Sequence, residues 1–253
     1  HGIVLVTGLT GSGKTTTLYT TLRHLAAPEV NVCTVEDPIE MIIPELNQMQ
    51  VQSGIDLNFA QGVRTLLRQD PDIIMVGEIR DLETGQMAVQ AALTGHRVLS
   101  TLHTNDAVSA ITRLLDLGIP PYLIQNVLIG VMAQRLARTL CPHCKESDQI
   151  DDALWEALVH PLPLPKPETI NKPHGCLECR NTGYLGRVGL YELLKVTPEL
   201  RRLFQIGVDE EVLRRVAFEH GMRPLRVSAA LQIAAGLTTF EEVAQILPPL
   251  EYH

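Results

Sequence analysis

Residues 3–15 read Ile3-Val4-Leu5-Val6-Thr7-Gly8-Leu9-Thr10-Gly11-Ser12-Gly13-Lys14-Thr15, a short apolar run that leads into a glycine-rich turn. The turn matches the phosphate-binding pattern G-x-x-x-x-G-K-[ST] from Gly8 to Thr15. Glycine allows backbone conformations closed to other residues, so main-chain N–H groups can point at phosphate oxygens. Lys14 supplies a mobile positive charge, and the Thr15 hydroxyl can bind Mg²⁺. We therefore predict a nucleotide-phosphate site made of Gly8, Thr10, Gly11, Ser12, Gly13, Lys14, Thr15 and Thr16.

The segments on either side of this turn have the context that such a site needs. Residues 3–6 are typical of a buried strand, and from Thr16 onward Leu18, Leu22 and Leu25 fall on one face of a helix. The helix directs its positive N-terminal end at the same phosphates. The alternative is a glycine-rich turn without a ligand, and the two flanks favour the phosphate site over it.

Composition limits the class of protein. The chain has 253 residues, enough for one large or two modest domains, and is 45% hydrophobic and 20% charged, as soluble globular proteins are. No apolar run approaches the length of a membrane span, so we expect no integral membrane segment. A net charge of −8 argues against nucleic-acid binding but leaves room for a local basic patch. Because the first residue is not Met and the core strand follows at once, we expect a fragment that lacks an N-terminal part.

An acidic turn follows the second predicted strand, Val30 to Val35. It reads Glu36-Asp37-Pro38-Ile39-Glu40, and ligands of α/β sheets bind just beyond the carboxyl ends of the strands. Most acidic turns are simply solvated. Beside a phosphate-binding loop, however, this turn is a candidate for positioning Mg²⁺ or water. Residues 41–52 are predicted as irregular strand or hairpin.

A third apolar strand, Ile73 to Val76, ends in Gly77-Glu78-Ile79-Arg80-Asp81. An apolar strand that ends in an acid is the second half of a P-loop NTPase site. The residue after Gly77 is Glu78 rather than Asp, which suits orienting or deprotonating an attacking water better than holding a metal. Arg80 has two interpretations, contact with phosphate or an ion pair with Asp81, and the sequence does not separate them.

The next predicted strand, Val98 to Leu102, leads into His103-Thr104-Asn105. His103 would lie where a sensor of the terminal phosphate belongs, whereas His96 is more simply a structural residue. Further helices are predicted over residues 58–67, 82–93, 106–117 and 122–140.

Four of the five cysteines form two knuckle-like pairs, Cys141-x-x-Cys144 and Cys176-x-x-Cys179. Two such pairs offer the thiolates of a closed structural zinc site, although the spacing between them is longer than usual. Disulfides and unligated thiols are the alternatives. The fifth cysteine, Cys33, lies in an apolar run and is predicted to be a buried small hydrophobe.

The segment between the cysteine pairs holds Pro161, Pro163, Pro165, Pro167 and Pro173, and is predicted as a semi-rigid loop rather than regular helix. A short strand is expected at residues 189–192. Helices are expected at residues 198–204, 210–220, 225–235 and 240–247. We predict three parts: an ATPase core over 1–140, a zinc-binding segment over 141–182 and a helical subdomain over 183–253.

Four spaced blocks together resemble the secretion ATPase superfamily of type II secretion and type IV pilus motors. Gly8–Thr15 corresponds to that family's Walker A, Val35–Glu40 to its Asp box, Val76–Asp81 to its Walker B and Thr94–Asn105 to its His box. The cysteine pairs, with Arg135-Leu-Ala-Arg138 before them, look most like the type II secretion and pilus assembly ATPases, because pilus retraction ATPases usually lack these cysteines. Leu9 departs from the Pro that the family often has, at a variable position.

The resemblance implies an α/β fold, a RecA-like P-loop core with a C-terminal zinc-binding and helical part. It implies ATP hydrolysis with Mg²⁺ by a homo-hexamer, peripheral at the cytoplasmic face of the inner membrane. The partners would be inner-membrane platform and adaptor proteins and pilin-like subunits. Carried onto this sequence, Glu78 is the catalytic carboxylate, Glu40 a second acidic participant and His103 a phosphate sensor, with Arg80 beside them. The family's N-terminal domain supplies arginines to the nucleotide, so we expect weak hydrolysis by this chain alone.

Three rivals are weighed against the motor interpretation. Clustered basic residues would favour a DNA-translocating conjugation ATPase, and the acidic net charge of this chain counts against it. A small-molecule P-loop kinase would need an acceptor pocket, and Glu78 with His103 fits a water nucleophile better. A non-hydrolysing nucleotide-binding module would not need Glu78.

Overall fold

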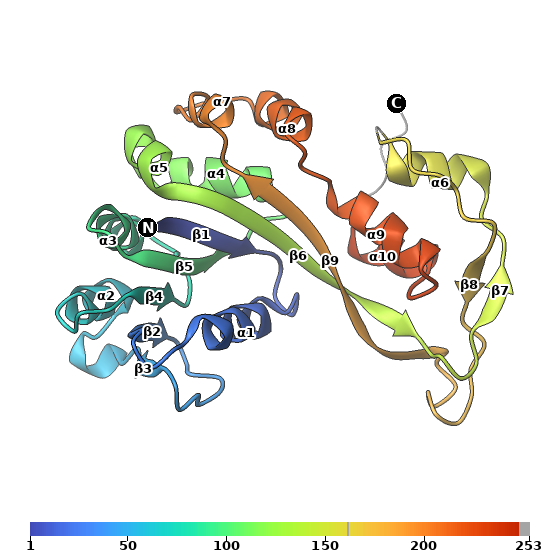
Figure 1. Ribbon diagram of the computed structural model, residues 1–253, viewed down its shortest axis with the longest axis horizontal. Helices are drawn as coiled ribbons and strands as arrows, with labels where there is room; N and C mark the ends of the chain where they lie inside the picture. The colour runs from blue at the N-terminus through green and yellow to red at the C-terminus, as the bar shows by residue number, and fades with distance from the viewer. Residues whose placement is uncertain (161, 248–253) are drawn as a thin grey trace. The chain divides into compact units, whose positions relative to one another are not determined.

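The computed structural model describes residues 1–160 and 162–247 (Figure 1). The chain forms two compact units. The first comprises residues 1–133 and 193–222, and the second comprises residues 134–192 and the chain from Arg223 on. Each unit is described by itself below.

The main sheet has seven strands in the order β3-β2-β4-β5-β1-β6-β9, with all pairs from β3 to β6 parallel. Because the strands are parallel, β1, β2, β4 and β5 end at the same edge of the sheet, where ligands bind in α/β folds. The strand β5 lies between β1 and β4, so the residues that follow it lie between those that follow the other two. The bounds are β1 (Gly2–Thr7), β2 (Val32–Glu36), β3 (Asn47–Gln50), β4 (Ile73–Val76), β5 (Arg97–Leu102), β6 (Leu128–Leu140) and β9 (Tyr184–Lys195).

Helices cover both faces of this sheet in the first unit. Figure 1 shows α1 (Lys14–Leu25) on one side of β1, β2, β4 and β5, and α2 (Phe59–Leu66) and α3 (Leu82–Leu93) on the other. The strands β1, β2 and β4 are mainly apolar and nearly all of their residues are buried, as burial on both faces requires. The remaining helical segments of this unit are η1 (Ser53–Ile55), α4 (Ala107–Asp116), α5 (Pro121–Val127), α7 (Pro198–Arg201) and α8 (Glu210–Glu219).

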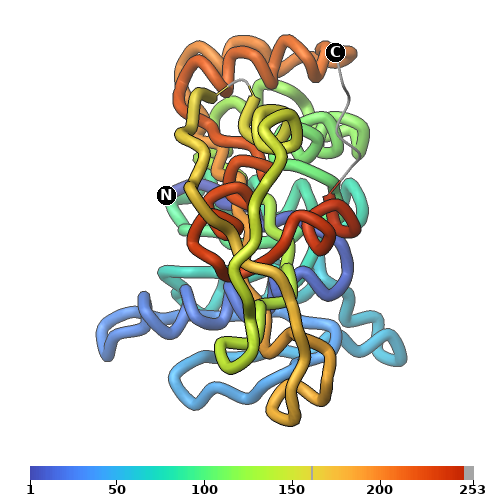
Figure 2. The backbone as a smooth tube through the Cα atoms, turned by 90° about the vertical axis from the view of Figure 1, so that its right-hand side faces the viewer, coloured from blue at the N-terminus to red at the C-terminus, as the bar shows by residue number. Residues whose placement is uncertain are grey.

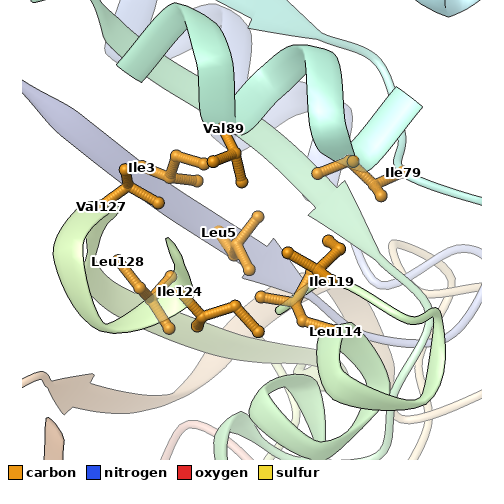
Figure 3. Close-up of a pocket in the computed structure, with 10 residues that line it drawn as sticks. Ile3, Leu5, Ile79, Val89, Leu114, Ile119, Ile124, Val127 and Leu128 are labelled. Atoms are coloured by element: carbon orange, nitrogen blue, oxygen red, sulfur yellow. The ribbon is translucent and has the colours of Figure 1, made fainter. Parts of the chain in front are cut away.

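Alternate residues of β1 pack on opposite sides. Val6 belongs to the apolar cluster with Leu18 and Leu22 of α1. Ile3 and Leu5 point the other way, toward the side chains from α3, α4 and α5 that Figure 3 shows. Packing there leaves an apolar cavity of about 10 Å³, barely the room that one water molecule needs, so this face is core and not a binding site.

The predicted helix over residues 122–140 is wrong in most of its length. Only Pro121–Val127 is helical, as α5, and β6 runs from Leu128 to Leu140. Tertiary pairing overrides local propensity here, because β6 completes the side of β1 that faces away from β5. On its other side β6 lies beside β9. Gly130 permits the two strands to approach closely there, because a Cβ at this position would lie 3.0 Å from the carbonyl oxygen of Leu194.

Residues 41–52, predicted as irregular strand or hairpin, form neither a hairpin nor a two-stranded unit. Asn47–Gln50 is β3, which pairs in parallel with β2 and closes one edge of the sheet. The segment before it, residues 37–46, is a loop that crosses from the end of β2 back to the start of β3.

The second unit contains β7 (Glu146–Asp148) antiparallel to β8 (Ile170–Lys172), and the helices α6 (Asp152–Val159), α9 (Leu225–Ala234) and α10 (Phe240–Ile246). The segment between the cysteine pairs is therefore not all loop. Asp151 caps α6 through the N–H groups of Ala153 and Leu154, and the helix ends before Pro161, which lies outside the described residues. Prolines further on are in irregular chain, as predicted.

The predicted strand at residues 189–192 is the middle of the longer β9, whereas the C-terminal helices follow the predicted ranges closely. The three-part division at residues 140 and 182 stays a prediction. Among the described residues, no helix combines the length and the apolar character that crossing a membrane requires.

Candidate nucleotide site and cysteine cluster

The glycine-rich turn joins β1 to α1, and all the residues predicted to bind phosphate lie in it or in the first turn of α1. Gly13 occupies the N-cap position in the left-handed region, with φ of 86°, which favours glycine. The start of α1 has no side-chain cap and no acidic residue in its first turn. By contrast, the side chains of Asn58, Asp81 and Asp106 cap α2, α3 and α4. The positive end of α1 is thus left for an anion.

Lys14 lies inside this turn. Its Nζ donates to the carbonyl oxygens of Gly8 at 2.8 Å and Leu9 at 3.2 Å. These contacts keep the ammonium group beside the glycine-rich backbone, where a phosphate at the start of α1 would meet it. The sequence prediction for Lys14 therefore agrees with its position.

Glu40 reaches the turn from the loop after β2. The Thr15 hydroxyl donates to Glu40 Oε1 at 3.2 Å. A hydroxyl and a carboxylate side by side offer two hard oxygen ligands, the kind that Mg²⁺ prefers. Of the predicted acidic turn, Glu40 and Asp37 are exposed, whereas Glu36 is buried.

Glu78 follows β4 and lies almost fully buried, with 9% of its surface exposed. It forms an ion pair with Arg80, and His103 Nε2 lies 3.6 Å from its Oε2. Arg80 thus pairs with Glu78 and not with Asp81, the carboxylate of which caps α3 by accepting from Thr84 N at 2.8 Å. The strand order therefore brings Glu78, Arg80 and His103 into one cluster.

His103 connects this cluster to the glycine-rich turn. Burial lowers its pKa, the positive charge of Lys14 lowers it further, the negative charge of Glu78 opposes both, and Arg80 adds a small decrease. Lys14 and Glu78 thus both lie near enough to His103 for their charges to act on its imidazole ring. The pKa below the usual range keeps His103 neutral at pH 7, able both to donate and to accept a hydrogen bond.

Hydroxyl groups that the sequence analysis did not single out fix the turns after the strands. Thr101 Oγ1 donates to the carbonyl oxygen of Gly77 at 2.7 Å, which ties β5 to the turn of Glu78. Thr7, at the end of β1, accepts from Thr104 N at 2.9 Å. The Thr7 and Thr104 hydroxyls also lie 2.7 Å apart. These bonds link the residues before the glycine-rich turn to those after His103. A threonine at the last position of a buried strand is the signal that could have revealed them.

His96 has the structural role predicted for it. Its Nδ1 lies 2.9 Å from the carbonyl oxygen of Ala91 and 3.1 Å from Thr94 Oγ1, at the end of α3. Cys33 is buried in β2, and burial raises the pKa of its thiol.

In the second unit the four remaining cysteines converge. Figures 1 and 2 show the chain around residue 141 beside the chain around residue 180, and Cys141 N donates to the carbonyl oxygen of Gly183 at 2.9 Å. All four Sγ atoms lie within 4.8 Å of one another. Three of the distances are 3.9 Å for Cys141–Cys176 and 3.8 Å for both Cys144–Cys179 and Cys176–Cys179.

These distances rule out disulfides among the alternatives that the sequence left open. A disulfide requires sulfurs about 2.05 Å apart, far closer than any pair here. Four sulfurs around one zinc ion with bonds of about 2.3 Å lie about 3.8 Å apart in a tetrahedron. The cluster therefore has the dimensions of a tetrathiolate metal site.

Backbone N–H groups surround the same sulfurs. Gly175 N donates to Cys144 Sγ at 3.3 Å, and Cys176 N and Gly183 N donate to Cys179 Sγ at 3.2 Å each. Burial opposes ionisation of the Cys179 thiol, but these two N–H groups and the thiols of Cys176 and Cys144 lower its pKa to about 6. In contrast, burial raises the pKa of Cys141, and that of Cys144 to about 11. The N–H donors stabilise thiolate, the form that binds a metal.

Solved structures similar to this chain include a pilus motor and an ATPase. The pilus retraction motor PilT with bound ADP has a TM-score of 0.70 and 30% sequence identity, over 98% of this chain and 62% of PilT. The ATPase DotB of Legionella pneumophila has a TM-score of 0.70 and 27% identity, over 97% and 59% of the two chains. These similarities confirm the predicted α/β ATPase fold.

Curated relatives are more similar in sequence. The type IV pilus assembly ATPase TfpB of Acinetobacter baylyi is 56% identical over 98% of this chain and 42% of its own length. The type II secretion system protein HxcR of Pseudomonas aeruginosa is 52% identical, and the type II secretion system ATPase E of Vibrio cholerae is 48% identical. Each of those two matches covers 97% of this chain and 48% of the relative, so the chain spans less than half the length of these relatives.

The family described as "Type II/IV secretion system protein" matches residues 1–245. This confirms the resemblance carried by the four sequence blocks. With its fold, its glycine-rich turn and its relatives in agreement, the chain belongs to the type II/IV secretion system protein family.

Proposed function

We propose that this chain is the ATP-hydrolysing part of a motor subunit that powers type II protein secretion or type IV pilus assembly. One observation carries the proposal: His103 lies 3.6 Å from Glu78 and near enough to Lys14 for its ring to respond to that charge. A cation for the terminal phosphates and a carboxylate for the attacking water are the two groups that nucleotide hydrolysis needs in one place.

Each predicted residue has a role in this proposal. The backbone from Gly8 to Thr16 and the Lys14 ammonium bind the phosphates of ATP. Thr15 and Glu40 hold Mg²⁺, which when bound neutralises charge on the phosphate oxygens. Glu78 orients or deprotonates the attacking water. Neutral His103 senses the terminal phosphate by donating a hydrogen bond to it. Arg80, with a side chain 65% exposed, is free to leave Glu78 and contact phosphate during the reaction.

We further propose that the cysteine cluster binds one Zn²⁺ ion through Cys141, Cys144, Cys176 and Cys179. Support comes from sulfur–sulfur distances of 3.8–3.9 Å and from the N–H donors around them. Four thiolates leave no position for a substrate, so the role of the ion is structural.

The assembly and partners of the whole protein are inferred from its relatives. We infer a homo-hexamer in the cytoplasm, peripheral at the inner membrane, that acts on inner-membrane platform and adaptor proteins and on pilin-like subunits. The relatives are a type IV pilus assembly ATPase and a type II secretion system ATPase, which supports this over the conjugation alternative. The net charge of −8 agrees with a protein that does not bind nucleic acid.

Two substitutions in the natural full-length protein test the hydrolysis proposal. Glu78→Gln should lower kcat by about 100-fold to 10,000-fold, the usual contribution of a general base, while ATP still binds. Lys14→Ala should lower kcat/KM by about 100-fold or more, because it removes a charge from the phosphates.

Steady-state phosphate release and binding of a fluorescent ATP analogue are the measurements. Arg68→Gln, on a helix end away from the cluster, is the matched surface control and should leave both unchanged. Turnover that survives both Glu78→Gln and Lys14→Ala would show that the site is wrongly assigned.

A further inference from the structure

The carboxylate of Glu36 is buried at the end of β2, with only 4% of the residue exposed. Burying a charged group is costly unless its oxygens accept hydrogen bonds. Three polar side chains donate to Glu36: the Tyr19 hydroxyl, Thr34 Oγ1 at 2.5 Å and Gln48 Nε2 at 3.1 Å. These donors come from α1, β2 and β3, so the carboxylate joins the helix after the glycine-rich turn to the edge of the sheet.

Tyr19 connects this carboxylate to the loop that carries Glu40. Tyr19 is 3% exposed and donates to Glu36, and the backbone of Glu40 and Met41 lies close enough to its phenol oxygen to act on its pKa. Burial and the neighbouring Glu36 raise the pKa of Tyr19 to about 12, so the phenol stays protonated and remains a donor. Since Tyr19 and Lys14 belong to the same helix, the phenol links the phosphate-binding helix directly to the main chain at Glu40.

Gln48 holds the same loop from the other side. Its Nε2 donates to the carbonyl oxygen of Met41 at 2.9 Å as well as to Glu36, and its Oε1 accepts from Ile43 N at 2.7 Å. Both the phenol of Tyr19 and the amide of Gln48 therefore contact Glu36 and the loop backbone. Gln48 binds the loop backbone at residues 41 and 43, and the phenol of Tyr19 lies beside residues 40 and 41.

Side-chain packing does not hold the loop at Glu40 itself. Met41 and Ile42 are 52% and 84% exposed, and burial resumes only at Ile43 with 3%. The position of the Glu40 backbone thus depends on the polar contacts that Tyr19 and Gln48 make around it more than on apolar contacts. The Glu40 carboxylate, in turn, reaches Thr15 Oγ1 at 3.2 Å.

We propose that Tyr19, fixed by the buried carboxylate of Glu36, is a positioning residue that sets Glu40 beside Thr15 of the glycine-rich turn. The inference rests on the proposed function, in which Glu40 and Thr15 hold Mg²⁺. A displaced Glu40 would lose its alignment with Thr15, and misplacement by about 1 Å is enough to lower a rate by up to about 100-fold.

The test is a double-mutant cycle in the natural full-length protein, with Tyr19→Phe, Glu40→Gln and both together. Phenylalanine keeps the ring in the apolar cluster with Leu18 and Leu22 and removes only the hydroxyl. We expect Tyr19→Phe to lower kcat by about tenfold and to raise the Mg²⁺ concentration for half-maximal activity by a similar factor, with the KM for ATP within about twofold. In the Glu40→Gln background the same change should have almost no further effect on kcat.

A matched control lies on the same helix. Thr21 Oγ1 donates only to the carbonyl oxygen of Thr17, at 2.8 Å, within α1. Thr21→Val removes a hydroxyl from α1 without touching the loop, so kcat and the Mg²⁺ dependence should stay unchanged. Circular dichroism and the urea midpoint of each variant report on folding. Tyr19→Phe should fold as the natural protein does, and kcat values are compared at temperatures where every variant is folded.

Two outcomes would overturn the proposal and leave ATP hydrolysis in place. One is a tenfold loss on Tyr19→Phe that is equal in both backgrounds, which would mean that the phenol acts through the general stability of the fold. The other is an unchanged kcat and Mg²⁺ dependence in Glu40→Gln, which would remove the target of the positioning. In either case loss of turnover in Glu78→Gln would still support the hydrolytic site, so the two claims fail separately.

Discussion

Burial and three nearby charges determine the pKa of His103. Burial, Lys14 and Arg80 lower this pKa, whereas Glu78 raises it. The ring remains mostly neutral because the lowering effects are larger. A neutral ring lets one nitrogen donate to a phosphate oxygen while the other accepts. The sensor role proposed for His103 therefore depends on the groups to either side of it.

This balance predicts pKa changes of opposite sign. Lys14→Met removes a positive charge, so protonation becomes easier and the pKa of His103 should rise toward its usual range. Glu78→Gln removes a negative charge, so the pKa should fall further. NMR titration of the imidazole Cε1–H signal measures both, with the signal among nine histidines assigned by its loss in His103→Gln. Equal shifts, or shifts of the same sign, would show that Lys14 and Glu78 do not flank one ring.

Sequence reasoning could propose the residues of a phosphate site because their chemistry is local. The pattern from Gly8 to Thr15 requires only a strand before it and a helix after it, and both flanks were visible. The partners of Glu36 were not predictable in this way. Tyr19, Thr34 and Gln48 are separated along the chain, and an acidic turn looks the same whether its first carboxylate faces solvent or the core.

At the scale of elements, the Arg138–Glu242 pair joins β6 to α10 within the second unit. Glu242, 5% exposed, accepts from the backbone N–H of Arg138 at 3.0 Å and from its Nε at 2.8 Å. The Arg138 guanidinium also lies over the Tyr184 ring, 4.2 Å from its centre. Burial opposes ionisation of Glu242, but the hydrogen bonds from Arg138 and its charge prevail and lower the pKa of Glu242.

A carboxylate with a lowered pKa in the folded state stabilises the fold above its unfolded pKa, and this contribution disappears as pH falls through the folded pKa. Glu242→Gln should thus reduce the free energy of unfolding by about 1–2 kcal/mol at pH 7, since Arg138 is half exposed and screened by solvent. The difference from the natural protein should shrink below about pH 4, near and under the usual pKa of Glu.

Urea unfolding between pH 3.5 and pH 7 measures this effect. The single tryptophan, Trp155, lies in the second unit, so its fluorescence reports on the unit that contains the pair. Glu241→Gln, an exposed neighbour on α10, is the control and should change stability by no more than about 0.5 kcal/mol. A difference for Glu242→Gln that does not vary with pH would show that the charge of Glu242 is not what stabilises the contact.

Element prediction failed where a strand depends on distant partners. The sequence over residues 122–140 contains enough helix-forming residues to suggest one long helix, but the chain changes to β6 after Val127. Residues 128–140 form a strand because they pair between β1 and β9 in the sheet. Both of these strands are distant from β6 in the sequence. Where long apolar or amphipathic segments stand alone, as in α2, α3 and α8, the predicted and observed helices agree closely.

At the scale of the whole molecule, the two units carry different kinds of site. The glycine-rich turn, Glu78 and His103 belong to the first unit, and the four clustered cysteines to the second. In the described part of the second unit, β7 and β8 form a sheet of two three-residue strands, so cross-linking by a metal would contribute a larger share of the stability of this unit.

We predict one Zn²⁺ per chain and loss of the ion in Cys176→Ser. Elemental analysis measures the zinc content of the natural protein and of Cys176→Ser. The melting temperature followed by Trp155 fluorescence measures how loss of zinc changes the stability of the second unit. Loss of zinc should lower that melting temperature by about 10 °C or more, because structural zinc contributes folding free energy directly. Cys33→Ala, in the first unit, should retain the ion. A protein free of metal that melts at the same temperature with and without a chelator would contradict the zinc proposal.

The central claim is that Lys14 and Glu78 act on one nucleotide, and a structure of the natural full-length protein with Mg²⁺ and a non-hydrolysable ATP analogue tests it most directly. The account predicts the terminal phosphate against the Lys14 ammonium, with the carboxylate of Glu78 facing it across a single water molecule. A nucleotide bound away from Lys14, or a Glu78 carboxylate directed at a different surface from the terminal phosphate, would contradict the account.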